Sequence, residues 1–137
     1  MVRLAGMLAA LVLALAAGAA PAAAKDAASR GDPNAGEAIY ARCLACHALA
    51  YDRTGPRHCG LFGRRAGSVK GFAYSEAMQR SKIVWNEKTL DRFLGNPLQA
   101  VPGTAMGYAG IADKKERADL IAYLDRANAS SECRKRP

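Results

Sequence analysis

Cys43-Leu44-Ala45-Cys46-His47 is the stretch that decides how the rest of this chain is interpreted. It has the form C-x-x-C-H, which is the attachment signature of a c-type haem. Two thiols at this spacing can each form a thioether bond with one vinyl group of the same porphyrin, and the histidine that follows can bind the iron as the proximal ligand. A zinc half-site or a thioredoxin-like redox pair is the alternative. We predict a covalently bound haem, for which the remaining chain must supply a second axial ligand and an apolar shell.

The first 24 residues predict a secretory signal peptide. Met1-Val2-Arg3 is a short basic start, residues 4–20 carry no charge, and Ala22-Ala23-Ala24 supplies small residues just before charged ones. This pattern is typical of an A-x-A-like cleavage site, whereas an uncleaved membrane anchor would need about 20 apolar residues. Nothing downstream is long and apolar enough to cross a membrane. We therefore predict export to the periplasm, a leader at residues 25–31, one domain at 32–130 and a C-terminal tail at 131–137.

The haem motif uses two of the four cysteines and leaves Cys59 and Cys133. An even remainder in an exported protein suggests a disulfide, because the compartment is oxidising. Free thiols or intermolecular pairing are the alternatives. A Cys59–Cys133 bridge would close a long loop and would contribute about 4 kcal/mol in the chain-entropy model.

The net charge is +8 and falls by one when Arg3 leaves with the signal peptide. The basic residues are spread along the chain. They form one run, which we interpret as a solvent-exposed end of the chain: Arg134-Lys135-Arg136. This distribution favours an electrostatically steered encounter with an acidic redox partner over binding to nucleic acid or a membrane surface.

Capping residues and apolar spacing predict an all-α fold with three main helices, short helices and long loops. Asp32 followed by Pro33 starts the first helix, which we expect over 33–42 and which delivers the haem motif. Asn86 caps a second helix that stops before Asn96-Pro97, and Asp113 with Glu116 starts a terminal helix that ends near Ala129. A short helix is expected within 74–80.

Met78 and Met106 are the methionines that remain after the predicted signal peptide. Met78 falls in the predicted short helix, where methionine is usually core filler. Met106 falls in a loop shaped by proline and glycine, so we favour it as the sixth ligand in the His/Met pair usual for electron carriers. His58 is the alternative, although its closeness to the haem motif makes the opposite face hard to reach. With both axial positions filled the iron has no open site for a substrate, which favours a carrier over an enzyme.

Taken together, residues 36–124 resemble class I cytochrome c, and are closer to its mitochondrial and α-proteobacterial branch than to the short bacterial types. Besides Cys43–His47, the motifs that carry the resemblance are Thr54-Gly55-Pro56, Gly60-Leu61-Phe62-Gly63-Arg64, Gly71-Phe72-Ala73-Tyr74, Trp85, Asn96-Pro97, Pro102-Gly103-Thr104-Ala105-Met106, Ala109-Gly110 and Asp119-Leu120-Ile121-Ala122-Tyr123-Leu124. The resemblance implies the small class I cytochrome c fold around one haem c.

The resemblance also implies roles for individual residues. His47 and Met106 would be the axial ligands, and the carbonyl of Pro56 would accept a hydrogen bond from His47. The residues expected around the haem propionates are Arg64, Tyr74, Trp85 and Thr104. The residues expected where the first and last helices cross are Gly36, Tyr40, Leu120 and Tyr123.

Several positions depart from the family pattern. His58 stands where the family commonly has leucine beside the proximal ligand, so hydrogen bonding or packing differs there. Met78 and Phe93 replace polar groups near the methionine ligand, which makes that side of the pocket more apolar. Cys59 and Cys133 are not general features of the family.

We predict a soluble, periplasmic, monomeric electron-transfer protein that is not an enzyme. Its redox partners would be an oxidase, a reaction centre, a cytochrome complex or a periplasmic dehydrogenase. Two alternatives are a haem peroxidase or gas-binding protein, which would need Met106 to be displaceable, and a zinc module built from Cys43, Cys46, His58 and Cys59.

Overall fold

The computed structural model describes residues 31–134. The elements, in chain order, are α2 (Pro33–Tyr40), the 3-10 turn η1 (Ala41–Cys43), α3 (Glu76–Arg80), α4 (Glu87–Gly95), α5 (Pro97–Ala100), α6 (Lys114–Asn128) and α7 (Ser131–Arg134). The predicted signal peptide (1–24), almost all of the leader and the end of the tail lie outside the described residues.

Helix α2 begins where the capping pattern predicts. The side chain of Asp32 accepts a hydrogen bond from the backbone N–H of Asn34, and Pro33 occupies the first turn, where its missing N–H costs nothing. The predicted helix over 33–42 is tightened at its end, since α2 passes into η1 at Ala41. This tight turn carries the chain directly into the haem motif.

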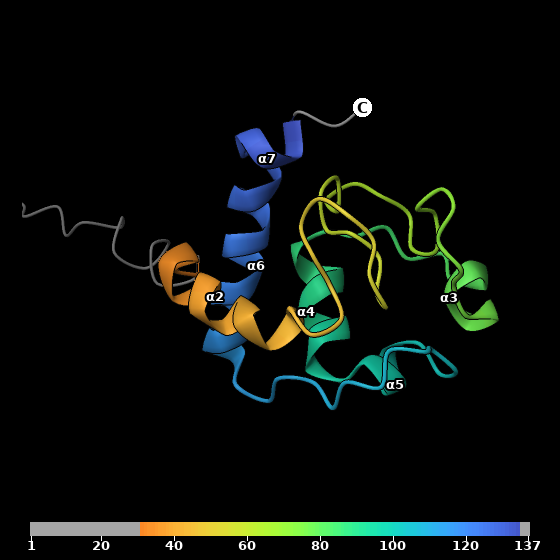
Figure 1. Ribbon diagram of the computed structural model, residues 1–137. Coiled ribbons are helices and arrows are strands. Elements are labelled where there is room, and N and C mark those ends of the chain that lie inside the picture. Colours follow the sequence, from red (N-terminus) through yellow and green to blue (C-terminus); the bar gives the residue numbers. More distant parts are fainter. Residues whose placement is uncertain (1–30, 135–137) are drawn as a thin grey trace, which may run out of the picture.

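Helices α2 and α6 cross against each other, as Figure 1 shows for the orange and blue ribbons. Gly36 lies at the crossing, where a Cβ atom would overlap the backbone carbonyl of Asp119. The backbone N–H of Asp32 donates to Asp119 Oδ1 at 2.6 Å, and the rings of Tyr40 and Tyr123 lie 5.1 Å apart. The crossing therefore combines close backbone approach with one buried carboxylate.

Helix α4 packs against the other side of α6. Asn86 and Thr89 form a reciprocal capping box at its start. Arg117 of α6 is buried, pairs with Asp91 of α4 at 2.7 Å, and donates to the carbonyls of Ile111 and Ala112. This guanidinium joins α6, α4 and the segment that connects them.

Long loops connect η1 to α3, and an isolated β-bridge joins Arg65 in these loops to Val84 in the segment between α3 and α4. Within residues 31–134 there is no strand, so the all-α prediction is confirmed. Two short helices were not predicted individually: α5 directly follows α4, and α7 begins where a tail was expected. No helix in the described range is long and apolar enough to span a bilayer.

Candidate haem site

The C-x-x-C-H stretch begins at the last residue of η1, Cys43, and forms a compact turn. The backbone N–H groups of Cys46 and His47 both donate to the carbonyl of Cys43, at 3.1 and 2.9 Å. The two thiols are unpaired: Cys43 packs against the core and Cys46 is exposed. Burial raises the pKa of the Cys43 thiol to about 11, so this group is a protonated thiol at neutral pH. Both sulfurs are thus free for thioether bonds.

His47 is held in one orientation by the segment that follows it. Its Nδ1 lies 2.8 Å from the carbonyl oxygen of Pro56 and donates to it, which leaves the lone pair on Nε2 free for a metal. Gly55 lies against the imidazole face, where a Cβ would overlap the ring. Burial lowers the pKa of His47, against the hydrogen bond to Pro56, and so favours the neutral ring that binds a metal.

Met106 lies in the loop between α5 and α6 and is partly buried against the core. Its backbone N–H donates to the hydroxyl of Thr104 at 3.3 Å, and the N–H of Thr104 donates to the carbonyl of Val101 at 3.0 Å. Gly103 adopts a φ of +87°, a left-handed conformation that other residues rarely take. The loop is therefore shaped locally by its own turns, with Met106 on its inner side and Thr104 buried.

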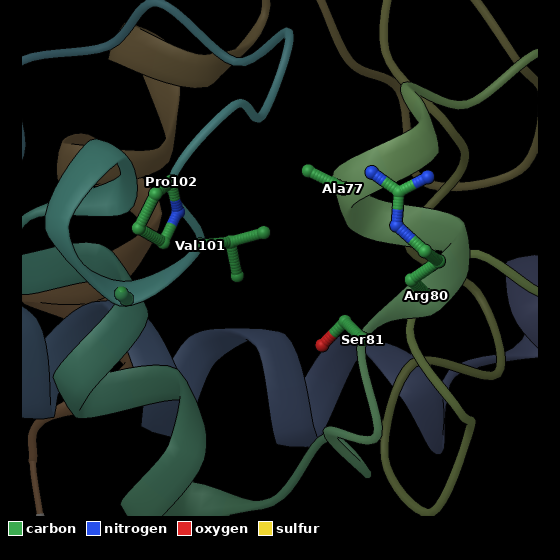
Figure 2. Close-up of a pocket in the computed structure, with 6 residues that line it drawn as sticks. Ala77, Arg80, Ser81, Val101 and Pro102 are labelled. Carbon is green, nitrogen blue, oxygen red and sulfur yellow. The ribbon is translucent and has the colours of Figure 1, made fainter.

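A cavity of about 320 Å³ separates α3 from the segment that leads to Met106 (Figure 2). Ala77 of α3 and Val101 extend toward this gap from opposite sides. The full lining comprises Ala77, Arg80, Ser81, Ala100, Val101 and Pro102. None of these is an expected ligand, so the cavity borders the Met106 loop and does not itself contain the predicted iron ligands.

Three of the residues expected around the propionates, Arg64, Tyr74 and Trp85, lie in the loops before α4, whereas Thr104 lies in the loop between α5 and α6. The guanidinium of Arg64 is partly buried and donates to the carbonyls of Cys59 and Arg57, each at 2.9 Å. It forms no salt bridge with a carboxylate within residues 31–134. The hydroxyl of Tyr74 accepts a weak hydrogen bond from Val69, and Trp85 packs against Phe93 with ring centroids 5.0 Å apart. A partly buried cation without a carboxylate suits an acidic cofactor group.

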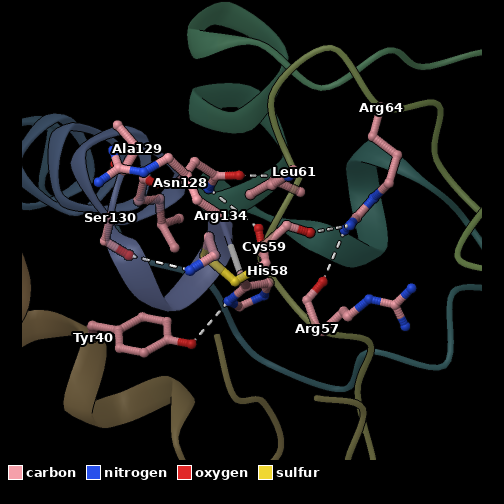
Figure 3. Close-up of a disulfide and its surroundings, with 12 residues drawn as sticks. Tyr40, Arg57, His58, Cys59, Leu61, Arg64, Asn128, Ala129, Ser130 and Arg134 are labelled. Carbon is pink, nitrogen blue, oxygen red and sulfur yellow. Dashed lines mark hydrogen bonds between the residues drawn. A yellow bond between two sulfur atoms is a disulfide. The ribbon is translucent and has the colours of Figure 1, made fainter. Parts of the chain in front are cut away.

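His58 stacks face to face on His47, with ring centroids 4.3 Å apart and planes inclined by 21°. The hydroxyl of Tyr40 lies 3.1 Å from His58 Nδ1 (Figure 3). Burial, with smaller effects from His47 and Arg64, lowers the pKa of His58 to about 3, so its ring is neutral. Two stacked rings cannot bind one iron from opposite faces, which leaves the sixth position to another residue.

The stack on His47 was not predicted from the sequence. The sequence shows that position 58 departs from the family pattern, but the contact depends on how the loop folds back. The N–H of His58 donates to the carbonyls of Ala48 and Leu49, each at 3.1 Å, and this pairing of the two chain segments brings His58 over His47. A histidine so soon after the haem motif was the available signal.

Cys59 and Cys133 are joined in the structure, 74 residues apart in sequence (Figure 3). The bridge connects the loop behind His47 to α7. It also removes Cys59 from the alternative zinc module, and within residues 31–134 no cluster of three histidine, cysteine or acidic residues could hold a metal ion. Asn128 supports the same junction, since its side chain accepts from the N–H of Leu61 and donates to the carbonyl of His58.

These residues fit a c-type haem. Two free thiols precede a neutral histidine with an available nitrogen, and a partly buried methionine lies on a separate loop. Arg64, one of the predicted propionate residues, forms no salt bridge with a carboxylate of residues 31–134.

Comparisons with known proteins agree with this arrangement. The family model described as cytochrome c matches residues 33–128. Cytochrome c2 of Blastochloris viridis is 44% identical over 118 residues, which cover 84% of this chain and 88% of that protein. Cytochrome c of Tetrahymena pyriformis is 53% identical over 96 residues, or 69% of this chain and 87% of the relative. The solved structure of cytochrome cH from Methylobacterium extorquens is 40% identical, has a TM-score of 0.69, and is matched over 70% of this chain and 99% of its own.

Proposed function

We propose that His47 and Met106 are the two axial ligands of the haem in this chain, which belongs to the cytochrome c family as a class I c-type cytochrome. Such a protein carries one covalent haem c and transfers electrons, and it is not an enzyme. The observation that carries the proposal is the hydrogen bond between His47 Nδ1 and the Pro56 carbonyl. It fixes the tautomer and leaves Nε2 as the only ring atom that can bind a metal.

The bound haem supplies an iron that accepts and releases single electrons. The residues of the chain bind the haem, supply the iron ligands and limit the access of water. Cys43 and Cys46 hold the porphyrin covalently, His47 and Met106 donate a nitrogen and a sulfur, and the buried core limits the access of water. Met106 is the candidate because it is the methionine on a loop, whereas Met78 is buried on α3 within the core cluster.

We assign the propionate environment to Arg64, Tyr74, Trp85 and Thr104, and its centre to Arg64. The guanidinium already donates to two carbonyls and still lacks a carboxylate partner in the described part of the chain. The phenol of Tyr74 accepts from Val69 and has its own proton left to donate. Such donors compensate acidic groups that are removed from water.

The proposal places the mature protein in the periplasm as a monomer, after cleavage following Ala24, with its domain at 32–130 and the Cys59–Cys133 disulfide intact. The residue pattern of the first 24 positions supports export, and the net charge of +8, reduced by one when Arg3 is removed, supports docking to an acidic redox protein. An oxidase, a reaction centre, a cytochrome complex or a periplasmic dehydrogenase would each meet that description.

The test is a reduced-minus-oxidised visible spectrum of protein matured in a host with haem-attachment machinery, recorded before and after adding carbon monoxide to the reduced form. We expect a low-spin c-type spectrum that carbon monoxide does not change, because both axial positions are filled.

The matched variants are Met106→Ala, which should bind carbon monoxide promptly, and Met78→Leu, which should behave like the wild type. A wild-type protein that binds carbon monoxide at once would contradict His47/Met106 ligation and would favour a gas-binding or peroxidase activity. A carbon monoxide response confined to the Met78 variant would indicate that Met78 on α3 is the sixth ligand.

A further inference from the structure

We propose that His58 is a positioning residue for the iron: its ring stacks on His47, fixes the plane of that imidazole and stabilises the oxidised state of the haem. The inference goes beyond electron transfer as such, because it assigns a determinant of the reduction potential to a residue that is not a ligand. It rests on the proposed role of His47 as the proximal ligand.

The stack has the geometry of a specific contact. The two imidazoles lie 4.3 Å apart between centroids and are inclined by only 21°. His47 is constrained on its edge by the Pro56 carbonyl and on a face by Gly55. The ring of His58 adds a third contact, stacked on the plane of the imidazole.

His58 is itself held from three directions. Tyr40, which is 3% exposed, reaches Nδ1 with its hydroxyl at 3.1 Å. The backbone N–H of His58 donates to the carbonyls of Ala48 and Leu49, and its own carbonyl accepts from Asn128 at 3.2 Å. Figure 3 shows Tyr40 extending from α2 to this ring beside the disulfide. A ring fixed in this way can impose its orientation on its neighbour.

The electrostatic consequence follows from the ring face. The oxidised iron carries one more positive charge than the reduced iron, and part of this charge is shared by the proximal imidazole. The face of an aromatic ring is the negative part of its quadrupole, so a stacked ring attracts a neighbour that becomes more positive. His58 thereby favours the ferric state. A leucine at this position has no such face.

The experiment compares the haem-loaded wild type with three variants, His58→Leu, His58→Gln and His58→Phe. Phenylalanine keeps a ring face without the Tyr40 contact, glutamine keeps a polar contact to Tyr40 without a ring, and leucine keeps neither. At a fixed ambient potential we expect the ferrous-to-ferric ratio to rise about threefold in the leucine and glutamine variants. Both variants lose the ring face, and with it a cation–π stabilisation of the ferric state that is of this size. The phenylalanine variant should stay close to the wild type.

A second measurement separates positioning from packing. The haem methyl shifts of the ferric protein in proton NMR report the plane of the axial imidazole, and we expect their order to change in the leucine and glutamine variants. If all three variants lose thermal stability while the ratio and the methyl shifts stay at the wild-type values, His58 is packing alone and the inference is wrong.

The same data keep this inference apart from the proposed function. A wild type without a low-spin c-type spectrum overturns the ligand assignment, and the inference with it. A wild type with that spectrum, together with variants that match it in ratio and methyl shifts, overturns the inference alone. If the leucine variant does not mature, the glutamine and phenylalanine pair decides the question.

Discussion

Pro56 and Gly55 contact the His47 ring through their backbone, whereas His58 contacts it through its side chain. The carbonyl of Pro56 accepts from one ring nitrogen, and the absence of a side chain at Gly55 leaves room for the ring. At the scale of single residues, the orientation of His47 therefore depends on backbone atoms as well as on a stacked ring. The three-residue run that carries them, Thr54-Gly55-Pro56, follows the haem motif closely in sequence.

Gly55→Ala should displace His47, because the new Cβ would overlap the imidazole. We expect a loss of stability of about 2 kcal/mol, typical of overpacking, together with a weakened low-spin spectrum. Guanidinium unfolding followed at the haem absorption band measures the first effect.

The matched control is Gly95→Ala, where a Cβ would meet the Arg117 side chain at an ordinary 3.7 Å. This variant should unfold close to the wild type. Equal effects of the two substitutions would mean that space beside His47 is not limiting.

At the scale of elements, the contact between α2 and α6 joins segments that are far apart in the sequence. The buried carboxylate of Asp119 accepts from the Asp32 N–H ahead of α2 and from Lys115 on its own helix, at 2.6 and 2.7 Å. Gly36 lets the two backbones approach directly above it. The crossing is thus one of the main supports of the fold.

Gly36→Ala should destabilise the crossing by about 1–3 kcal/mol, because the added methyl group meets backbone atoms that cannot rotate away. The free energy of unfolding in guanidinium measures this change, with Gly95→Ala again as the control. An unchanged midpoint would show that the helices can separate slightly at no cost.

Asp119→Asn should lower stability at neutral pH by about 2 kcal/mol, since a charged acceptor is lost from a buried site. Burial alone would raise the pKa of Asp119, but the hydrogen bonds from Lys115 and Asp32 outweigh it and hold the pKa below its ordinary value of 3.8. A depressed carboxyl pKa stabilises the fold above that ordinary value, and the contribution is lost as the pH falls through the lower folded pKa.

The difference in unfolding free energy between wild type and Asp119→Asn should therefore shrink below about pH 4. Thermal unfolding at a series of pH values measures it. A difference that stays constant down to the lowest pH would show that Asp119 stabilises the fold through its shape and not through its negative charge.

The sequence predicts the elements better than it predicts the contacts between them. The caps at Asp32, Asn86 and Asp113 are local signals, because each involves a residue two or three positions away. The burial of Arg117 is not local: it depends on Asp91 of another helix and on carbonyls of the preceding segment. A charged residue in an amphipathic helix gives no sign of such partners, and the His58 stack was missed for the same reason.

At the scale of the whole molecule, the Cys59–Cys133 bridge ties the loop behind His47 to the end of the helical scaffold. Asn128 of α6 makes a second connection to the loop that contains Cys59, since its side chain hydrogen-bonds to both His58 and Leu61. In Figure 1, α7 continues from the end of α6. The described chain is thus closed on the side of His47 by one covalent link and a group of hydrogen bonds.

Replacing both cysteines by serine should lower the free energy of unfolding by about 4 kcal/mol, as expected when a loop of this length is no longer constrained in the unfolded state. Guanidinium unfolding followed by Trp85 fluorescence measures the change. The wild type treated with a reductant should approach the double variant. A double variant as stable as the wild type would show that the haem and the helix crossing alone hold this side closed.

The coexistence of one bridge and two open thiols sets an order of events in biosynthesis. Of the single bridges that the four cysteines could form, only Cys59–Cys133 leaves both Cys43 and Cys46 available for the porphyrin. These two are synthesised before Cys133, so an oxidant that acts on thiols as they appear would join them to each other first. Attachment of the porphyrin therefore requires either that it arrives before Cys43 and Cys46 are oxidised, or that a reductant reopens a bridge between them.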